Sequence, residues 1–275
     1  MPYLSLNQIK QYQDQGFLAP LDVFSNVEAK KIRDEIEYIE KKMPTEIDKS
    51  GRYNVHLISP LLDSIVHNSK ILDFVQSVIG KNILVCGTTL FIKNPNEVGF
   101  VSYHQDAKYI GLEPHNWVTA WVAITESNEK NGCMKMWAGS HKDNLKDHNQ
   151  KFNKGNLLTR GQTVENVPEA KVQNVVLKAG QMSLHHPTIV HGSGLNKSSD
   201  RRIGFVIQSY IGSNVKQVLG KNGVQIARGI DEFKYHEVIK RTSSLMNNED
   251  IKLRQKENNN LQEIFYKGSS KKGQF

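Results

Sequence analysis

The first part of the chain, residues 1–80, shows apolar positions three or four apart, as on one face of an α-helix. The clearest start is a capping box, Ser25 with Glu28 three residues later, and Ile32, Ile36 and Ile39 follow it on one side. We predict three helices: one that follows Ser5 and closes at Gly16, one that follows Ser25, and one from about Ser69 to Val78 that stops at Gly80.

From Asn82 the pattern changes to short runs of β-branched and aromatic residues separated by Gly, Asn and Pro, which is typical of antiparallel strands. Asn131-Gly132 and Ala179-Gly180 mark tight turns between such runs. The candidate strands are Ile83–Lys93, Phe100–Asp106, Val118–Thr125, Met134–Trp137, Gln173–Leu177, Gln181–His185 and Ile203–Ile211. This order predicts a mainly β fold, a jelly-roll barrel with helices packed outside it.

Two segments interrupt or follow this pattern. Residues 141–170 are polar and too long for an ordinary connection, so they form either a lid over a substrate or a surface excursion. After Gly229, apolar and charged residues alternate, which predicts one or two helices before a disordered, lysine-rich end at 267–272. We expect a single domain over residues 1–275: a helical part (1–80), a β core (82–211) that contains the 141–170 insertion, and a C-terminal helical tail (230–275).

A chain of 275 residues, 38% of them hydrophobic, can bury a substantial core. The longest convincing apolar run, Val118–Ile124, is too short to cross a membrane, and Met1–Leu4 lacks the charged start of a signal peptide. The two cysteines, Cys86 and Cys133, lie in apolar segments, so we expect small core residues in a reducing cytoplasm.

The net charge of +8 would suit an anionic partner such as nucleic acid, a membrane surface or a phosphorylated substrate. However, the lysines are spread along the chain, and the small clusters Lys30-Lys31, Lys41-Lys42 and Lys271-Lys272 are more simply solvated faces. Neither a membrane nor a nucleic acid is therefore the expected partner.

The main candidate for chemistry is His104 with Asp106 on a predicted strand. Side chains two apart on a strand project from the same face, so an imidazole and a carboxylate can grip one metal ion. With ten histidines a chance match is nearly expected, and His141 with Asp143 has the same form. The first pair lies in a strand and the second among turn residues, which favours the first, although a buried histidine can also serve only hydrogen bonding.

A third histidine, His191, precedes Gly-Ser-Gly, and Arg201-Arg202 follow. Two histidines and one carboxylate leave open positions on a metal, as in non-haem Fe(II) oxygenases. The guanidinium of Arg202 suits the far carboxylate of a dicarboxylate cosubstrate. Because neighbours on a strand face opposite sides, only one of Arg201 and Arg202 should reach the pocket.

These residues resemble the phytanoyl-CoA dioxygenase family, in the order and spacing of its signature. The motifs are Tyr103–Ala107, Thr119–Ala123, Asn131–Met134 and Gly139–Lys142, then Ala179-Gly180, Leu184–His186, His191–Asn196 and Asp200–Arg202. The similarity covers about Leu4 to Ile211 and leaves the tail outside.

The resemblance implies a double-stranded β-helix, the jelly-roll of cupin-like proteins, with Fe(II) and 2-oxoglutarate as cofactors. His104, Asp106 and His191 would then be the iron ligands. Arg202 would bind the 5-carboxylate of 2-oxoglutarate, with Ser193, Trp121 and Lys93 around it.

Some positions are ambiguous or depart from the family pattern. His185 and His186 are rival ligands that we interpret as strand-end residues, and Ala138 stands where the family often has Pro. The carboxylate at Asp106 disfavours halogenation, because halogenating relatives have a small side chain there.

We therefore expect an Fe(II)- and 2-oxoglutarate-dependent dioxygenase that uses dioxygen to hydroxylate an unactivated C–H bond of a small organic substrate, such as an acyl-CoA, an amino acid or a secondary metabolite. The alternatives are a 2-oxoglutarate oxygenase directed at nucleic acid and a non-catalytic, cupin-like barrel that binds a metal or ligand. The sequence leaves the substrate and the oligomeric state open.

Overall fold

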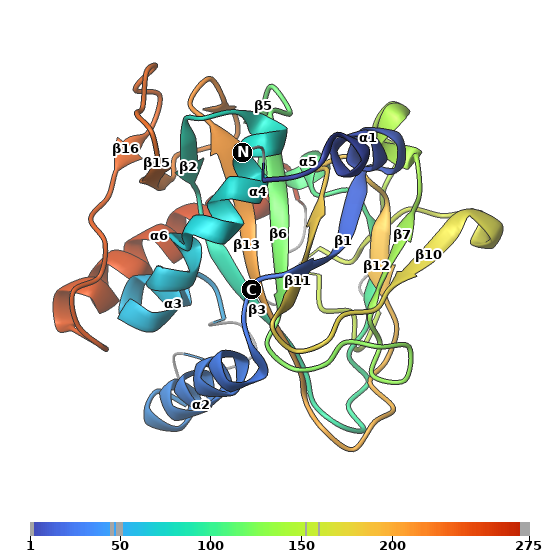
Figure 1. The fold of residues 1–275 in the computed structure, drawn as a ribbon, viewed down its shortest axis with the longest axis horizontal. Coiled ribbons are helices and arrows are strands. Elements are labelled where there is room, and N and C mark those ends of the chain that lie inside the picture. Colours follow the sequence, from blue (N-terminus) through green and yellow to red (C-terminus); the bar gives the residue numbers. More distant parts are fainter. Residues whose placement is uncertain (1–2, 45–46, 48–51, 152, 159, 270–275) are drawn as a thin grey trace.

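Two β-sheets face each other in the centre of the protein, and helices cover the outside of the larger one (Figure 1). The computed structural model describes residues 3–44, 47, 52–151, 153–158 and 160–269. Met1, Pro2, Lys271 and Lys272, which entered the expectations above, lie outside these residues.

The larger sheet runs in the order β1-β11-β6-β13-β2-β15-β16, and β3 also pairs with β13. Its neighbours are antiparallel except β15 and β16, which pair in parallel. The bounds are β1 Phe17–Asp22, β2 Ile83–Val85, β3 Thr88–Lys93, β6 Trp117–Ala123, β11 Gln181–His185, β13 Arg202–Gly212, β15 Gly223–Arg228 and β16 Glu237–Val238.

The smaller sheet has the order β10-β7-β12-β4, all antiparallel. Its strands are β4 Val101–His104, β7 Met134–Trp137, β10 Val172–Val175 and β12 His191–Ser193. Two further pairs join β5 Leu112–Glu113 with β14 Lys216–Gln217, and β8 Asn149–Gln150 with β9 Gln162–Thr163. Together the facing sheets form the predicted jelly-roll, a double-stranded β-helix.

The helices are α1 Leu6–Gln15, α2 Asn26–Lys42, α3 Pro60–Val66, α4 Ser69–Ile79, α5 Ala107–Ile110 and α6 Asn248–Tyr266, with short 3₁₀ turns η1 Val55–Ile58, η2 Ser140–Lys142 and η3 Glu169–Lys171. The capping boxes at Ser5 and Ser25 are formed, and Gly16 and Gly80 end α1 and α4, as predicted. Ile32, Ile36 and Ile39 are buried in the main core.

The central strand β13 buries side chains on both of its faces. Ile203, Phe205 and Ile207 join the core beneath the outer helices, whereas Val206, one residue out of step with them, joins the core between the sheets. Since side chains alternate across a strand, this two-sided burial explains why the sequence here is a continuous apolar run.

The structure corrects several element predictions. Residues 1–80 are not all helical, because β1 lies within them, and α3 was not expected. The predicted strand 83–93 is two strands, β2 and β3, which are separated at Cys86-Gly87. The tail is helical only from Asn248, since residues 230–247 form irregular backbone and the short β16.

None of the helices in the described ranges is both long and apolar enough to cross a lipid bilayer. Both cysteines are free thiols, with Cys133 buried and Cys86 half-buried.

Candidate active site

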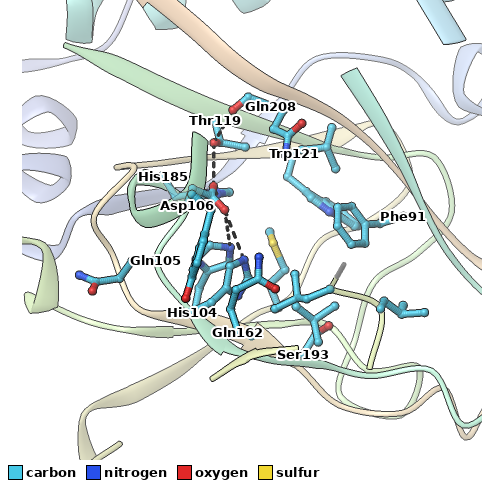
Figure 2. Close-up of a pocket in the computed structure, with 18 of the residues that line it drawn as sticks. Phe91, His104, Gln105, Asp106, Thr119, Trp121, Gln162, His185, Ser193 and Gln208 are labelled. Carbon is cyan, nitrogen blue, oxygen red and sulfur yellow. Dashed lines mark hydrogen bonds and ion pairs between the residues drawn. The ribbon is translucent and has the colours of Figure 1, made fainter. Parts of the chain in front are cut away.

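A cavity opens between the two sheets, and both contribute side chains to it (Figure 2). Its polar side includes His104, Asp106 and His191, together with Thr119 and Gln208. Its other walls are mainly apolar and include Phe91, Val101, Tyr109, Ile110, Trp121, Met134, Leu157, Leu158, Val206 and Phe265.

His104 is the last residue of β4, but Asp106 is not on the strand as predicted. Asp106 has helical backbone angles, φ −58° and ψ −42°, and precedes α5. The two side chains therefore converge because the chain turns from strand to helix between them, and strand alternation is not the cause.

His191 reaches the same place from the neighbouring strand. In the antiparallel pair of β12 and β4, His191 lies directly opposite His104. Opposite residues share one face of a sheet, and here the ring centroids are 4.2 Å apart.

The three side chains present one ligand atom each to a common point, because these atoms all lie within 4.8 Å of one another. The Nε2 atoms of His104 and His191 lie 3.3 and 3.8 Å from Asp106 Oδ1. Their Nδ1 atoms lie 2.9 and 3.2 Å from the backbone carbonyls of Ser102 and Ile189. A carbonyl can only accept, so each Nδ1 carries the proton and each Nε2 is left as a lone pair, the form that binds a metal.

Burial and mutual charge set the protonation of this group. Burial raises the pKa of Asp106, but the neighbouring histidines outweigh it and hold that pKa well below its usual range. Burial, aided by the charge of His104, lowers the pKa of His191 to about 3. At neutral pH Asp106 is thus a carboxylate and His191 a neutral imidazole, as metal binding requires.

Arg202 lies on the cavity wall and is only 1% exposed. It donates through Nη1 to the carbonyl of Gly132, 2.7 Å away, and its guanidinium lies 5.2 Å from the centre of the Trp121 ring. Its buried Nε has no hydrogen-bond partner among the described residues. Burial lowers the pKa of Arg202 to about 10, so it stays charged at neutral pH.

Lys93 lies opposite Arg202 in the β3–β13 pair and is also only 1% exposed. Its Nζ donates to Ser193 Oγ, 2.7 Å away, and to the carbonyl of Gly194. Burial and the nearby Arg202 lower the pKa of Lys93 to about 6. Within the described part of the chain no carboxylate contributes to the pKa shift of either residue, so Arg202, and Lys93 once it is protonated, can accept an anionic ligand.

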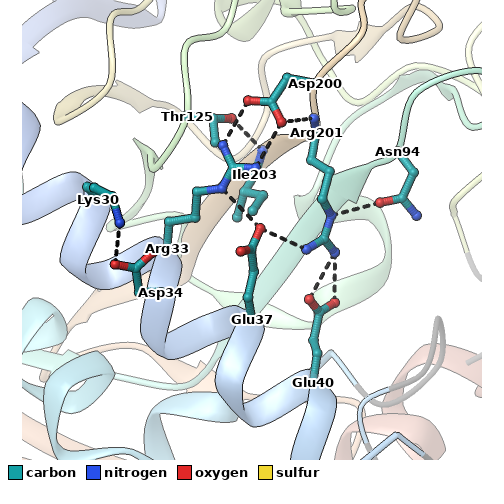
Figure 3. Close-up of polar contacts among 10 residues, drawn as sticks. All are labelled: Lys30, Arg33, Asp34, Glu37, Glu40, Asn94, Thr125, Asp200, Arg201 and Ile203. Carbon is teal, nitrogen blue, oxygen red and sulfur yellow. Dashed lines mark hydrogen bonds and ion pairs between the residues drawn. The ribbon is translucent and has the colours of Figure 1, made fainter.

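Arg201 points away from this site toward α2 (Figure 3). It donates to both carboxylate oxygens of Glu40, at 3.0 and 2.9 Å, and to Asn94. Its neighbour Asp200 binds Arg33 of α2 through two hydrogen bonds of 2.8 Å. Arg201 therefore bonds α2 to the start of β13, whereas Arg202 faces the cavity.

The other histidines that the sequence offered as ligands also differ in whether they face the cavity. His141 donates to the Gln13 carbonyl and Asp143 binds Lys146, so the second His-x-Asp pair does not converge. His186 turns toward His141, with ring centroids 5.3 Å apart. His185, however, lines the cavity beside Asp106, which its interpretation as a strand-end residue did not anticipate.

Sequence reasoning also missed Thr119, Gln208 and Phe265 as parts of the cavity. Thr119 could have been found, because it lies two residues from Trp121 and so shares its face of β6. Phe265 carried no such signal, since α6 reaches the cavity only through the tertiary fold.

Two imidazoles and one carboxylate, with the imidazole protons held on the outer nitrogens, fit the ligand set of a non-haem Fe(II) oxygenase. The unpaired Nε of Arg202 beside Lys93 fits a carboxylate of a second ligand. Fold and site thus define a non-haem iron oxygenase.

The chain belongs to the phytanoyl-CoA dioxygenase (PhyH) family, whose sequence model matches residues 12–204. It is 28% identical over 233 residues to a probable alpha-ketoglutarate-dependent hypophosphite dioxygenase of Stutzerimonas stutzeri, covering 78% of this chain and 80% of that protein. It is 30% identical over 224 residues to the peroxisomal phytanoyl-CoA dioxygenase of Bos taurus, covering 72% of this chain and 66%, just under two thirds, of the bovine protein.

Among solved structures, the non-heme monooxygenase ThoJ in its apo form matches with a TM-score of 0.80 and 28% identity, over 92% of this chain and 98% of ThoJ. CytC3 with Fe(II) and alpha-ketoglutarate matches with a TM-score of 0.67 and 22% identity, over 86% of this chain and 93% of CytC3, a likeness of fold alone. With the family established, the protein is an Fe(II)- and 2-oxoglutarate-dependent dioxygenase.

Proposed function

We propose that this dioxygenase hydroxylates an unactivated C–H bond of a small organic molecule, with His104, Asp106 and His191 as the iron ligands. The observation that carries the proposal is the position of their three ligand atoms, within 4.8 Å of one another on the wall of a largely apolar cavity. Bound Fe(II) and 2-oxoglutarate would supply the activation of dioxygen.

The ligands are held in place before any metal arrives. The carbonyls of Ser102 and Ile189 fix the orientation and tautomer of the two imidazoles. The register of β4 and β12 fixes their separation. Since little ordering remains to be done, metal binding has a small entropic cost.

Arg202 would bind the 5-carboxylate of 2-oxoglutarate through its unpaired Nε edge, and Lys93 would add a second positive charge. Ser193 holds the Lys93 ammonium, and Trp121 packs against the Arg202 guanidinium. In this arrangement Ser193 and Trp121 orient the two cations that recognise the cosubstrate.

The apolar walls favour an organic substrate and exclude water from the reacting carbon. The acyl-CoA in the name of the bovine relative makes an acyl-CoA one candidate, beside an amino acid or a secondary metabolite. Hypophosphite, in the name of the bacterial relative, is less suited to side chains such as Leu157, Leu158 and Phe265. A nucleic-acid substrate rests on the net charge of +8 alone.

We also propose that residues 1–275 act as one oxygenase domain, because Phe265 of the tail helix lines the same cavity as the strands. A cytoplasmic location is supported by the two free thiols.

The test is aerobic incubation of the protein with Fe(II), 2-oxoglutarate and a metabolite extract, followed by mass spectrometry. We expect succinate together with a metabolite that has gained one oxygen atom. Formation of succinate without any hydroxylated product from chemically diverse extracts would contradict C–H hydroxylation. Absence of succinate under all conditions would contradict the proposed ligand set.

A further inference from the structure

His185, at the end of β11, is a buried histidine beside the metal centre with no assigned task. It is only 2% exposed, and neither of its ring nitrogens has a hydrogen-bond partner within the described residues. Leaving a polar group buried and unpaired costs stability, so such a side chain calls for an explanation. Its Nε2 lies 3.5 Å from Asp106 Oδ2.

The two oxygens of Asp106 have different neighbours (Figure 2). Oδ1 faces His104 and His191, at 3.3 and 3.8 Å. Oδ2 faces His185 at 3.5 Å and the hydroxyl of Thr119 at 3.2 Å. One oxygen therefore points to the metal position and the other points into the barrel wall.

The Thr119 hydroxyl cannot donate to Asp106 Oδ2 and to a second acceptor at once, because a hydroxyl has a single proton. Its oxygen lies 2.8 Å from the carbonyl of Gln208, which can only accept, and 3.2 Å from Asp106 Oδ2. The proton lies in the shorter contact, so of the two described side chains shown near Oδ2, His185 is the one left to donate to it.

The sheet register keeps His185 in this position. His185 pairs with Thr119 across β11 and β6, so both side chains project from the same face toward Asp106. His186, the next residue, projects the other way, and its Nδ1 lies 2.8 Å from the Thr188 hydroxyl. The two adjacent histidines therefore provide a matched pair, of which only one faces the metal centre.

We propose that His185 is a positioning residue that donates from Nε2 to Asp106 Oδ2 and so keeps this oxygen away from the metal. Asp106 would then present Oδ1, and not Oδ2, to a metal ion held with His104 and His191. The inference rests on the ligand set of the proposed function. It adds a role that the ligand set does not require.

The test is titration of the metal-free, full-length protein with Co(II), which is stable in air and reports coordination by its visible spectrum. His185→Phe fills the same space without a donor, so Asp106 loses the hydrogen bond that orients it. Co(II) binding should then weaken about 10–100-fold and the spectrum should change. His185→Gln restores a donor and should bind within about threefold of the unaltered protein. His186→Phe, the matched control, should leave affinity and spectrum unchanged.

Unaltered Co(II) affinity and spectrum in His185→Phe would overturn the inference. A complete loss of binding, as severe as in His104→Ala, would also overturn it, because His185 would then be a ligand itself. If His185→Phe does not fold, His185→Leu makes the same comparison. Should the unaltered protein bind no Co(II), the ligand set of the proposed function fails, a result distinct from failure of the His185 role alone.

Discussion

At the scale of single residues, the site depends on charges that burial would normally suppress. Asp106 remains a carboxylate because three histidines surround it, and Arg202 remains charged although it is 1% exposed. The buried charge of Arg202 has no carboxylate partner among the described residues and is costly, so this residue reduces stability until a ligand binds. We expect Fe(II) and 2-oxoglutarate to raise the unfolding temperature together, because both bind only the folded state.

The first prediction concerns the ligands. His104→Ala and Asp106→Ala should each abolish formation of succinate from 2-oxoglutarate, because either change leaves two protein ligands on the metal. Asp143→Ala is the control, since Asp143 belongs to the second His-x-Asp pair and its carboxylate binds Lys146 at the surface. Substantial turnover in either ligand variant would refute the assignment.

The second prediction is a pH dependence that originates at Lys93. Its pKa of about 6 leaves it mostly neutral at pH 7.5, whereas a bound carboxylate favours the ammonium form. Binding of 2-oxoglutarate should therefore take up a proton, and its affinity should fall by up to about tenfold per pH unit above 6. Calorimetry in buffers of different ionisation enthalpy measures this uptake.

The same pKa has a consequence for stability. Between pH 6 and 10.5 the unfolded chain holds a proton on Lys93 that the folded chain lacks, so the contribution of this residue to stability rises with pH across that window. Lys93→Met removes the titrating group and should flatten both dependences. An unchanged proton uptake in this variant would assign the effect to another group.

At the scale of elements, β13 supplies the cavity with Arg202 and also makes space for its neighbour. A Cβ atom on Gly204 would lie 2.1 Å from a ring carbon of Trp121, so glycine at this position lets the indole pack directly against β13. Trp121 in turn packs against Arg202. Strand β13 therefore positions the Arg202 guanidinium and, at Gly204, leaves space for the Trp121 ring that packs against this guanidinium.

The third prediction follows from this close approach. Gly204→Ala should displace the Trp121 ring, cost about 1–3 kcal/mol of stability and weaken 2-oxoglutarate binding about tenfold or more. Gly99→Ala is the control, because its Cβ would make only ordinary contacts of 3.6 Å with Leu157. Thermal unfolding and cosubstrate titration measure both effects, and normal affinity in Gly204→Ala would show that Trp121 does not orient Arg202.

Local signals in the sequence explain which elements could be predicted. The capping boxes at Ser5 and Ser25 act within one helical turn, and both helices begin where predicted. The bounds of β7 and β11 also agree with the prediction. In contrast, β1 is short, contains Pro20 and is a strand only because it pairs with β11, far along the chain.

In the candidate site, too, some features could be predicted from local sequence signals and others could not. The three proposed ligand residues belong to motifs that can be read in order, and they do meet in space. The turn that carries Asp106, the contact of His185 and the wall provided by Phe265 depend on register and tertiary packing. No spacing rule within one segment contains that information.

At the scale of the whole molecule, the cavity is closed by three segments that are distant in sequence. Arg160, from the 141–170 insertion, donates through Nη1 to the carbonyls of Phe265 and Lys267, each 3.2 Å away, at the end of α6. Its guanidinium also lies 5.0 Å from the centre of the ring of Tyr109, a residue of α5. The insertion thus reaches the tail helix, which lies outside the family match at 12–204.

The fourth prediction tests this closure. Arg160→Ala removes two charge-assisted hydrogen bonds from the last carbonyls of α6, so that end should fray and exchange its amide protons at least about tenfold faster. Arg160→Lys should rescue little, because an ammonium does not reproduce the planar guanidinium that lies over the Tyr109 ring. The amides of α2, on the outer face, serve as the internal control in hydrogen–deuterium exchange. Unchanged exchange at α6 would mean that Phe265 is held at the cavity by packing alone.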